Sequence, residues 1–261
     1  MSSIEYIEKV IEPFPWAPLL SYLNSRLIPH CEFVDGLVYR RITEEGNVTV
    51  RYIHSEKHLI VSTPDSPNSK DYLDRIRFLF QYTLDWKPAP QLKDDPILCS
   101  KVESIPGFRP LGAWDRFELS VRTIIGQQVT VAAAQTIMQR VVDRCHGEIT
   151  ADNLVKANLE GVGMPGGRVR TLQCLAENVA NGEINLSSDW DTLRPRLLMQ
   201  KGIGPWTVNY LGIRMGRDPD AFPSSDIGLL RATNAQNKYE LEQLAEKWKP
   251  HRALAAVYLW A

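Results

Sequence analysis

The sequence predicts an α+β protein in which an antiparallel sheet with flanking helices precedes an all-helical region. Three observations support this prediction. Apolar residues alternate with polar ones between residues 31 and 63, amphipathic patterns recur from residue 116 to the end, and a proline-rich stretch at residues 86–90 separates the two. We therefore expect two domains, comprising residues 1–93 and 94–261.

The first domain should begin with a helix, because prolines open residues 14–27 and leucines then recur there at helical spacing. Short strands joined by tight turns follow, which predicts an antiparallel meander. The expected strands are built around Phe33, Leu37–Tyr39, Val48–Ile53 and Leu59–Val61. A second amphipathic helix over about residues 70–84 completes the domain.

Strand patterns disappear after the proline-rich stretch, and many short helices are expected instead. Their separators are short and rich in glycine, proline or aspartate. The expected helices cover residues 116–125, 130–145, 151–158, 168–181, 190–200, 205–215, 225–234, 238–248, and a final segment from 251.

Charge and composition narrow the classes of function. The chain has 30 Lys and Arg against 31 Asp and Glu, so no strong overall field attracts nucleic acid and any such binding must be local. The four cysteines lack the spacing of a zinc or iron–sulfur site. The N-terminus does not resemble a signal peptide, and no apolar run is long enough to span a bilayer. We expect a soluble, intracellular protein with no membrane partner.

The most informative stretch is the turn Gly202–Gly204, which joins two apolar helices, the second beginning at Pro205. Glycines let a ligand approach the backbone closely, and the free N–H groups of the following helix can hold a phosphate. Taken alone, this pattern is more typical of a plain tight turn between helices than of a phosphate site.

The residues around this turn distinguish it from a plain turn between helices. Gly202–Thr207, followed by Phe222–Asp226, resembles the helix-hairpin-helix–GPD DNA glycosylase superfamily, and within it the AlkA-type 3-methyladenine DNA glycosylases II. Residues 112–130, 159–168 and 248–260 are similar to further parts of that family's helical core. The resemblance implies that residues 1–93 form a TBP-like antiparallel sheet domain and that residues 94–261 form an all-α helix-hairpin-helix glycosylase core.

The resemblance assigns catalysis to Asp226, whose carboxylate would stabilise positive charge on the sugar carbon or orient the attacking water. Ser224 or Ser225 is expected to cap a helix, which places Asp226 in the first helical turn. The alternative is that an acidic residue after two serines is only ordinary helix-start chemistry.

Three aromatic residues match positions that line the base pocket in this family, namely Trp206, Tyr210 and Trp260. We expect Tyr22 of the N-terminal helix to add to the pocket. An extruded base is read by stacking, and a cationic alkylated purine gains about 1–2 kcal/mol over electron-rich rings. Alternatively, Trp206 and Tyr210 belong to the core, since they are four residues apart on one helix face.

The family resemblance also predicts how DNA is held. Gln127 and Gln128 match the loop that enters the minor groove, where many members carry an apolar wedge at the second position. Backbone amides at Gly202 and Gly204, with Thr207 in reach, should bind phosphates. A structural monovalent cation is expected on hairpin carbonyls, namely those of Leu198, Gln200 and Ile203.

Bifunctional members of the superfamily carry a Schiff-base lysine where this chain has Trp206, so strand cleavage is not expected. The resemblance thus implies a monofunctional glycosylase that excises N-alkylated purines such as 3-methyladenine and 7-methylguanine from double-stranded DNA. It should act as a monomer with no required cofactor, in the cytoplasm at the nucleoid in a bacterium or in the nucleus of a eukaryote. The alternatives are a glycosylase for deaminated or oxidised bases and a non-catalytic DNA-binding protein.

Overall fold

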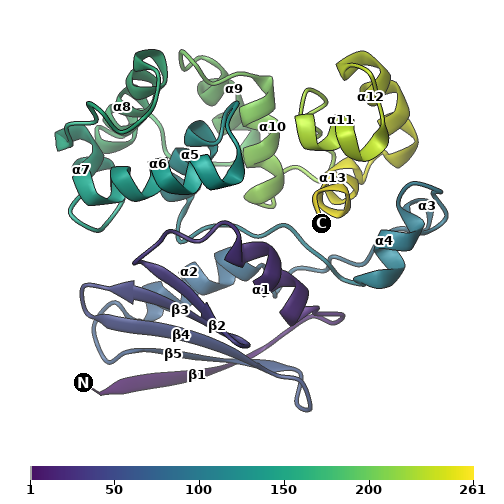
Figure 1. Ribbon diagram of the computed structural model, residues 1–261. Helices are drawn as coiled ribbons and strands as arrows, with labels where there is room; N and C mark the ends of the chain where they lie inside the picture. The colour runs from purple at the N-terminus through teal and green to yellow at the C-terminus, as the bar shows by residue number, and fades with distance from the viewer. Residues whose placement is uncertain (1) are drawn as a thin grey trace.

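The computed structural model describes residues 2–261 and has the predicted α+β architecture (Figure 1). Its N-terminal part contains a five-stranded antiparallel sheet with strand order β1-β5-β4-β3-β2. The strands are β1 Ser3–Lys9, β2 Glu32–Asp35, β3 Val38–Thr43, β4 Gly46–Ile53 and β5 His58–Pro64. Strands β2 to β5 form the predicted meander.

Strand β1 lies outside the predicted strands and pairs with β5 at the edge of the sheet. Its half-buried positions are Ile4, Tyr6 and Glu8, so a charged residue interrupts the apolar alternation that marks a strand. The Glu8 carboxylate is satisfied by an ion pair with Arg77 at 2.8 Å and a hydrogen bond from the Tyr82 hydroxyl at 2.9 Å. These long-range partners let an acidic residue occupy an inward position.

Two helices lie over one face of the sheet, between the sheet and the rest of the molecule (Figure 1). They are α1 Trp16–Asn24 and α2 Ser69–Phe80. Helix α2 ends before the predicted residue 84 because Gln81 adopts a left-handed backbone conformation with φ of 47°.

The rest of the chain is helical. Helices α3 and α4 were not among the expected elements, because each is too short to show an amphipathic period. The helices are α3 Pro90–Lys93, α4 Cys99–Ser104, α5 Arg116–Ile125, α6 Val131–Arg144, α7 Ala151–Lys156, α8 Gly166–Ala180, α9 Trp190–Leu198, α10 Pro205–Arg214, α11 Ile227–Thr233, α12 Lys238–Ala245, the 3₁₀ turn η1 Glu246–Trp248 and α13 Arg252–Trp260.

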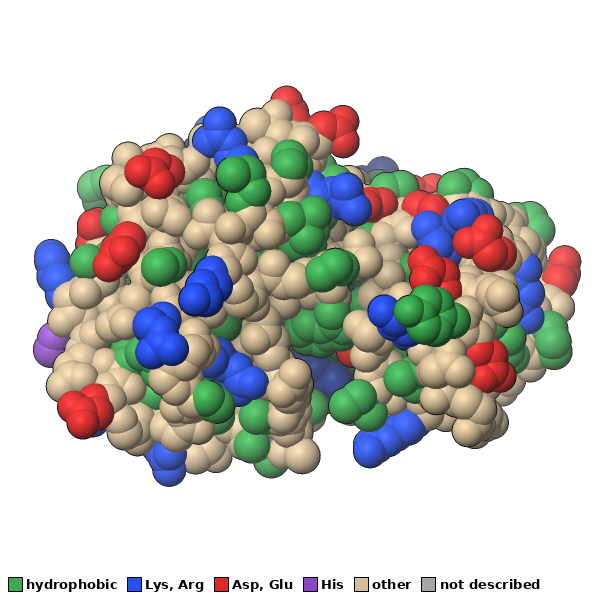
Figure 2. Space-filling view, turned by 90° about the horizontal axis from the view of Figure 1, so that it is seen from above, with side chains coloured by type: hydrophobic (Ala, Val, Ile, Leu, Met, Phe, Trp, Pro, Cys, Tyr) green, Lys and Arg blue, Asp and Glu red, His purple; other side chains and the backbone are tan. Residues whose placement is uncertain are grey.

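The buried apolar residues form two clusters that divide the helices into two groups. One cluster joins the sheet, α1 and α2 to α11–α13, and the other lies among α5–α10. Figure 2 shows a hollow between the two groups of helices, with hydrophobic side chains at its floor. In residues 2–261, no helix combines the length and the apolar character needed to cross a bilayer.

Candidate active site

Asp226 is the residue that caps helix α11, and this differs from the expected arrangement. Its backbone is extended, with φ of −71° and ψ of 124°, and its Oδ1 accepts the backbone N–H of Leu229 at 3.0 Å. Neither Ser224 nor Ser225 is the cap, so Asp226 precedes the first turn and does not lie within it. The N-terminal N–H groups of α11 still point toward the carboxylate.

Two indoles hold the same carboxylate from other directions. The Nε1–H of Trp206 donates to Oδ2 of Asp226 at 2.9 Å, and the Nε1–H of Trp260 donates to Oδ1 at 3.1 Å. These residues come from α10 and α13, far apart in the chain. Gly228 leaves room for this contact, because a Cβ there would lie 3.0 Å from Oδ1 of Asp226. Asp226 is thus fixed by three N–H donors.

The predicted aromatic residues form a continuous stack beside this carboxylate. The rings of Trp206 and Tyr210 lie 5.4 Å apart and nearly parallel, and the ring of Tyr210 lies 5.2 Å from that of Trp260. Trp206, Tyr210 and Trp260 are all only partly buried. They are therefore not simply core residues, and the stack presents aromatic surface next to Asp226.

Tyr22 approaches the same place from α1 of the sheet domain. Burial raises the pKa of Tyr22, Tyr210 and Asp226 raise it further, and Arg26 and Arg214 lower it. Tyr22 is thus close enough to Tyr210, Arg214 and Asp226 for their charges to act on its hydroxyl. The guanidinium of Arg26 lies 3.7 Å from the centre of the Tyr22 ring.

The hairpin between α9 and α10 uses its two glycines differently. Gly202 has φ of 89°, and a Cβ there would lie 2.0 Å from Oγ1 of Thr171, so this position requires glycine. Gly204 is extended, with φ of −102°, and a Cβ there would meet no atom within 4 Å. Of the two glycines, only Gly202 has the positive φ that a tight turn requires. Gly204 leaves the start of α10 open to a ligand.

The loop between α5 and α6 contacts this hairpin directly. The side-chain amide of Gln127 donates to the carbonyl of Gly202 at 3.1 Å and to the hydroxyl of Thr207 at 2.9 Å. Thr207 is buried, with its hydroxyl engaged by Gln127 in the free protein. Gln128 is exposed in the middle of the loop and has a left-handed backbone, with φ of 56°.

The expected cation site involves the carbonyls that lead into and through the hairpin. The carbonyl of Gln200 accepts the N–H of Ile203 at 3.0 Å, and Leu198 is the last residue of α9. A carbonyl oxygen with one hydrogen bond retains a lone pair that can coordinate a cation. The monovalent cation stays a prediction. Among residues 2–261 no cluster of histidine, cysteine, aspartate and glutamate suits a metal ion.

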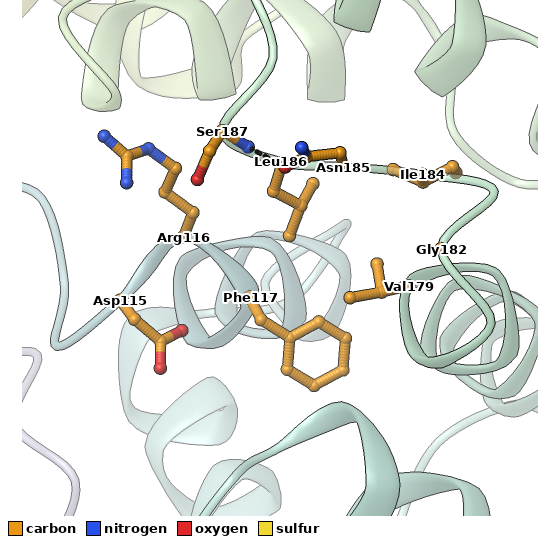
Figure 3. Close-up of a pocket in the computed structure, with 9 residues that line it drawn as sticks. All are labelled: Asp115, Arg116, Phe117, Val179, Gly182, Ile184, Asn185, Leu186 and Ser187. Carbon is orange, nitrogen blue, oxygen red and sulfur yellow. Dashed lines mark hydrogen bonds between the residues drawn. The ribbon is translucent and has the colours of Figure 1, made fainter.

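A cavity of about 440 Å³ lies elsewhere, between the start of α5 and the loop after α8. Phe117, Val179 and Leu186 line it, and none of the predicted site residues does (Figure 3). Asp115, at its edge, is already engaged, since it caps α5 and pairs with Arg75 at 2.9 Å. This cavity offers no catalytic group comparable to Asp226.

Two residues near the aromatic stack were not predicted as site residues from the sequence. Gly228 gives no local signal, since its role depends on the approach of Trp260. Arg214 contacts the hydroxyl of Tyr210 through Nη1 at 2.5 Å. The available signal for Arg214 was its spacing, because it follows Trp206 and Tyr210 at four-residue intervals on one helix face.

The chain is similar to known proteins in both sequence and fold. Residues 9–115 match the AlkA N-terminal domain. Over 95% of its length the chain is 30% identical to the "Probable bifunctional transcriptional activator/DNA repair enzyme AlkA" of Mycobacterium tuberculosis, and it spans 55% of that protein. The chain thus spans about half the length of this curated relative.

Two other matches extend over nearly the whole of both proteins. The chain is 27% identical to DNA-3-methyladenine glycosylase 2 of Escherichia coli, with 95% of this chain and 94% of the relative covered. The solved structure of the 3-methyladenine DNA-glycosylase from Archaeoglobus fulgidus shares the fold, with a TM-score of 0.76 at 21% identity and coverage of 100% and 97%. The chain is therefore a homologue of proteins named AlkA and DNA-3-methyladenine glycosylase 2, and it shares the α+β fold of the Archaeoglobus fulgidus structure.

Proposed function

We propose that this protein is a monofunctional DNA glycosylase that excises N-alkylated purines, including 3-methyladenine and 7-methylguanine, from double-stranded DNA. One observation carries the proposal. The carboxylate of Asp226 is fixed by Trp206, Trp260 and the Leu229 amide at the edge of a three-ring aromatic stack. An ordinary helix cap needs only the Leu229 contact, so the two indole donors indicate a carboxylate held for another purpose.

The chemistry follows from this placement. An extruded base would stack on the rings of Trp206 and Tyr210, which would bring its sugar carbon toward Asp226. As the bond between sugar and base breaks, positive charge develops on the sugar ring. A carboxylate already oriented by three donors stabilises that charge without reorganising. Water then adds to the sugar carbon, which leaves an abasic site.

DNA would be held by local contacts, consistent with the net charge of −1. The open start of α10 at Gly204 offers unpaired backbone N–H groups to a phosphate. Gln128 is exposed in the adjoining loop, and Gln127 ties that loop to the hairpin. The phosphate clamp and the minor-groove loop would therefore move as one unit, and a single monomer would suffice.

We also propose that the enzyme hydrolyses the bond between base and sugar without cleaving the DNA strand. Trp206 occupies the position of the Schiff-base lysine of bifunctional relatives, and an indole cannot form an imine. Its N–H is also engaged by Asp226. We place the enzyme in the compartment of the DNA, which is the nucleoid of a bacterium or the nucleus of a eukaryote.

The test is product analysis with methylated duplex DNA. We expect free 3-methyladenine and 7-methylguanine by chromatography, with strands that break only after alkali treatment. Strand breaks without alkali would contradict the monofunctional assignment, and release of only deaminated or oxidised bases would contradict the lesion class. DNA binding without any base release would contradict the enzymatic function altogether.

A further inference from the structure

Arg214 is a buried cation whose side-chain hydrogen bonds within residues 2–261 all go to uncharged oxygens. It is 7% exposed at the end of α10. Its Nε donates to the carbonyl of Leu111, its Nη2 donates to the carbonyl of Gly112 at 2.8 Å, and its Nη1 donates to the hydroxyl of Tyr210 at 2.5 Å. The two carbonyls fix the guanidinium, so its position against Tyr210 does not depend on a mobile partner.

This contact determines where the proton of Tyr210 points. A guanidinium only donates hydrogen bonds, so the oxygen of Tyr210 is the acceptor and its own O–H must be directed elsewhere. Within residues 2–261 that O–H makes no hydrogen bond, whereas the indole N–H groups of Trp206 and Trp260 are engaged by Asp226. Tyr210 therefore carries a free donor in the aromatic stack, polarised by a neighbouring positive charge.

Building on the proposed glycosylase function, we propose that Arg214 and Tyr210 together form a hydrogen-bond donor to the leaving base, which accelerates the excision of uncharged lesion bases more than that of cationic ones. Tyr210 would touch the base, and Arg214 would act through Tyr210 as a positioning residue. The fixed positive charge of Arg214 would also offset part of the attraction between the aromatic stack and a cationic base.

The charge balance of the reaction explains the selectivity. When the bond between the sugar carbon and the base nitrogen breaks, the electron pair stays with the base. A cationic base such as 7-methylguanine then leaves as a neutral molecule and needs no stabilisation. A neutral base leaves as an anion, which the Tyr210 O–H and the Arg214 charge would stabilise until solvent protonates it. Water adds to the sugar carbon and loses its proton to solvent in either case.

The experiment compares single-turnover excision of two bases from duplexes of the same sequence, namely hypoxanthine as the neutral base and 7-methylguanine as the cationic one. Tyr210→Phe keeps the ring and removes the hydroxyl. We expect it to slow hypoxanthine release about tenfold or more and 7-methylguanine release less than about threefold. Arg214→Met should show the same selectivity, and Arg214→Lys should lie between Arg214→Met and the wild type. In the Arg214→Met background, Tyr210→Phe should add little further selectivity.

Tyr239→Phe is the matched control, because Tyr239 is an exposed tyrosine on α12, and its rates should equal those of the wild type. Thermal unfolding shows whether the Arg214 variants fold, and Tyr210→Phe tests the inference if they do not. Equal slowing of both bases would overturn it, as would a wild-type enzyme that releases 7-methylguanine but not hypoxanthine. Release of neither base by the wild type would instead refute the proposed function.

Discussion

At the scale of single residues, the two oxygens of Asp226 have different surroundings. Oδ1 accepts from the Leu229 amide and the Trp260 indole, while Oδ2 accepts only from Trp206. Each donor is an N–H whose position is set by a helix, so the carboxylate has little freedom to rotate. The lone pairs that remain free, chiefly on Oδ2, are available to a sugar or a water molecule.

Gly228→Ala tests this fixed position without altering any of the polar groups. The new Cβ would lie 3.0 Å from Oδ1 of Asp226, so the carboxylate must shift by a few tenths of an ångström. We expect excision to slow about tenfold, because catalysis depends on precise placement of the reacting groups. Stability should not fall, since alanine favours a helix over glycine by up to about 1 kcal/mol.

Gly167→Ala is the matched control, since Gly167 is also the second residue of its helix, α8, and a Cβ there would lie 4.0 Å from Arg170. It should leave the excision rate unchanged. The account of Gly228 would be wrong if both alanine variants excised bases at the wild-type rate.

At the scale of elements, the two glycines of the hairpin between α9 and α10 serve different purposes, one for folding and one for DNA binding. Gly202→Ala should lower stability by about 2 kcal/mol or more, because it combines an unfavourable φ with a clash against Thr171. Gly204→Ala should leave the melting temperature unchanged, since the new Cβ meets nothing in the free protein. It should nevertheless weaken DNA binding about tenfold, because the methyl group would stand where a phosphate approaches α10.

Thermal unfolding and a fluorescence binding assay with an abasic-site duplex measure the two effects of the hairpin variants. A Gly204→Ala variant that binds DNA as tightly as the wild type would show that the start of α10 does not contact the backbone of DNA.

The elements also show how far the sequence could predict this molecule. The meander from β2 to β5 and most helices were predictable, because their apolar periods are local and regular. Strand β1 was hidden by Glu8, whose inward position depends on Arg77 and Tyr82 about 70 residues away. The capping role of Asp226 could not be predicted for a different reason, because Ser224, Ser225 and Asp226 are all good caps.

The site was predictable only as a set of residues. The family resemblance named Asp226, Trp206 and Trp260 as candidates, and the structure brings these three together through contacts between α10, α13 and the start of α11. The contact of Gln127 with the hairpin joins residues 75–80 positions apart. Such pairings leave no local trace in one sequence, because periodicity reports only which face of an element is buried.

At the scale of the whole molecule, three buried charges and the partly buried Arg122 join the sheet to the helical part. Glu32 and Arg41 come from β2 and β3, and Glu118 and Arg122 come from α5. Arg41 contacts Glu118 at 2.8 Å and Glu32 at 3.4 Å, and Arg122 contacts Glu32 at 2.6 Å and Glu118 at 2.8 Å. Helix α5 leads directly into the loop of Gln127. The four charges therefore fix the sheet domain against the helix that positions this loop.

These charges predict a specific dependence of stability on pH. Burial alone would raise the pKa of Glu118, but Arg41 and Arg122 lower it from 4.5 to about 2. A carboxyl group with a lowered pKa stabilises the fold above its unfolded value, so this contribution is complete above pH 4.5 and is lost as the pH falls toward 2. Glu118→Gln should lower stability at pH 7 by about 3 kcal/mol and flatten the dependence between these limits.

Denaturant unfolding of both proteins at several pH values measures this effect, and the difference between them isolates Glu118 from other carboxyl groups. Stability curves for the wild type and Glu118→Gln that stay parallel from pH 7 to pH 2 would contradict the assigned role of the four charges.

Asp226→Asn tests most directly whether the carboxylate of Asp226 drives base release. Asparagine keeps the shape, and its oxygen can still cap α11, while its NH2 group removes only the acceptor of the Trp206 indole. The fold and the affinity for an abasic-site duplex should therefore be retained. The single-turnover rate of 3-methyladenine release should fall about 100-fold or more. A variant that folds, binds DNA and releases the base within about tenfold of the wild-type rate would contradict the account.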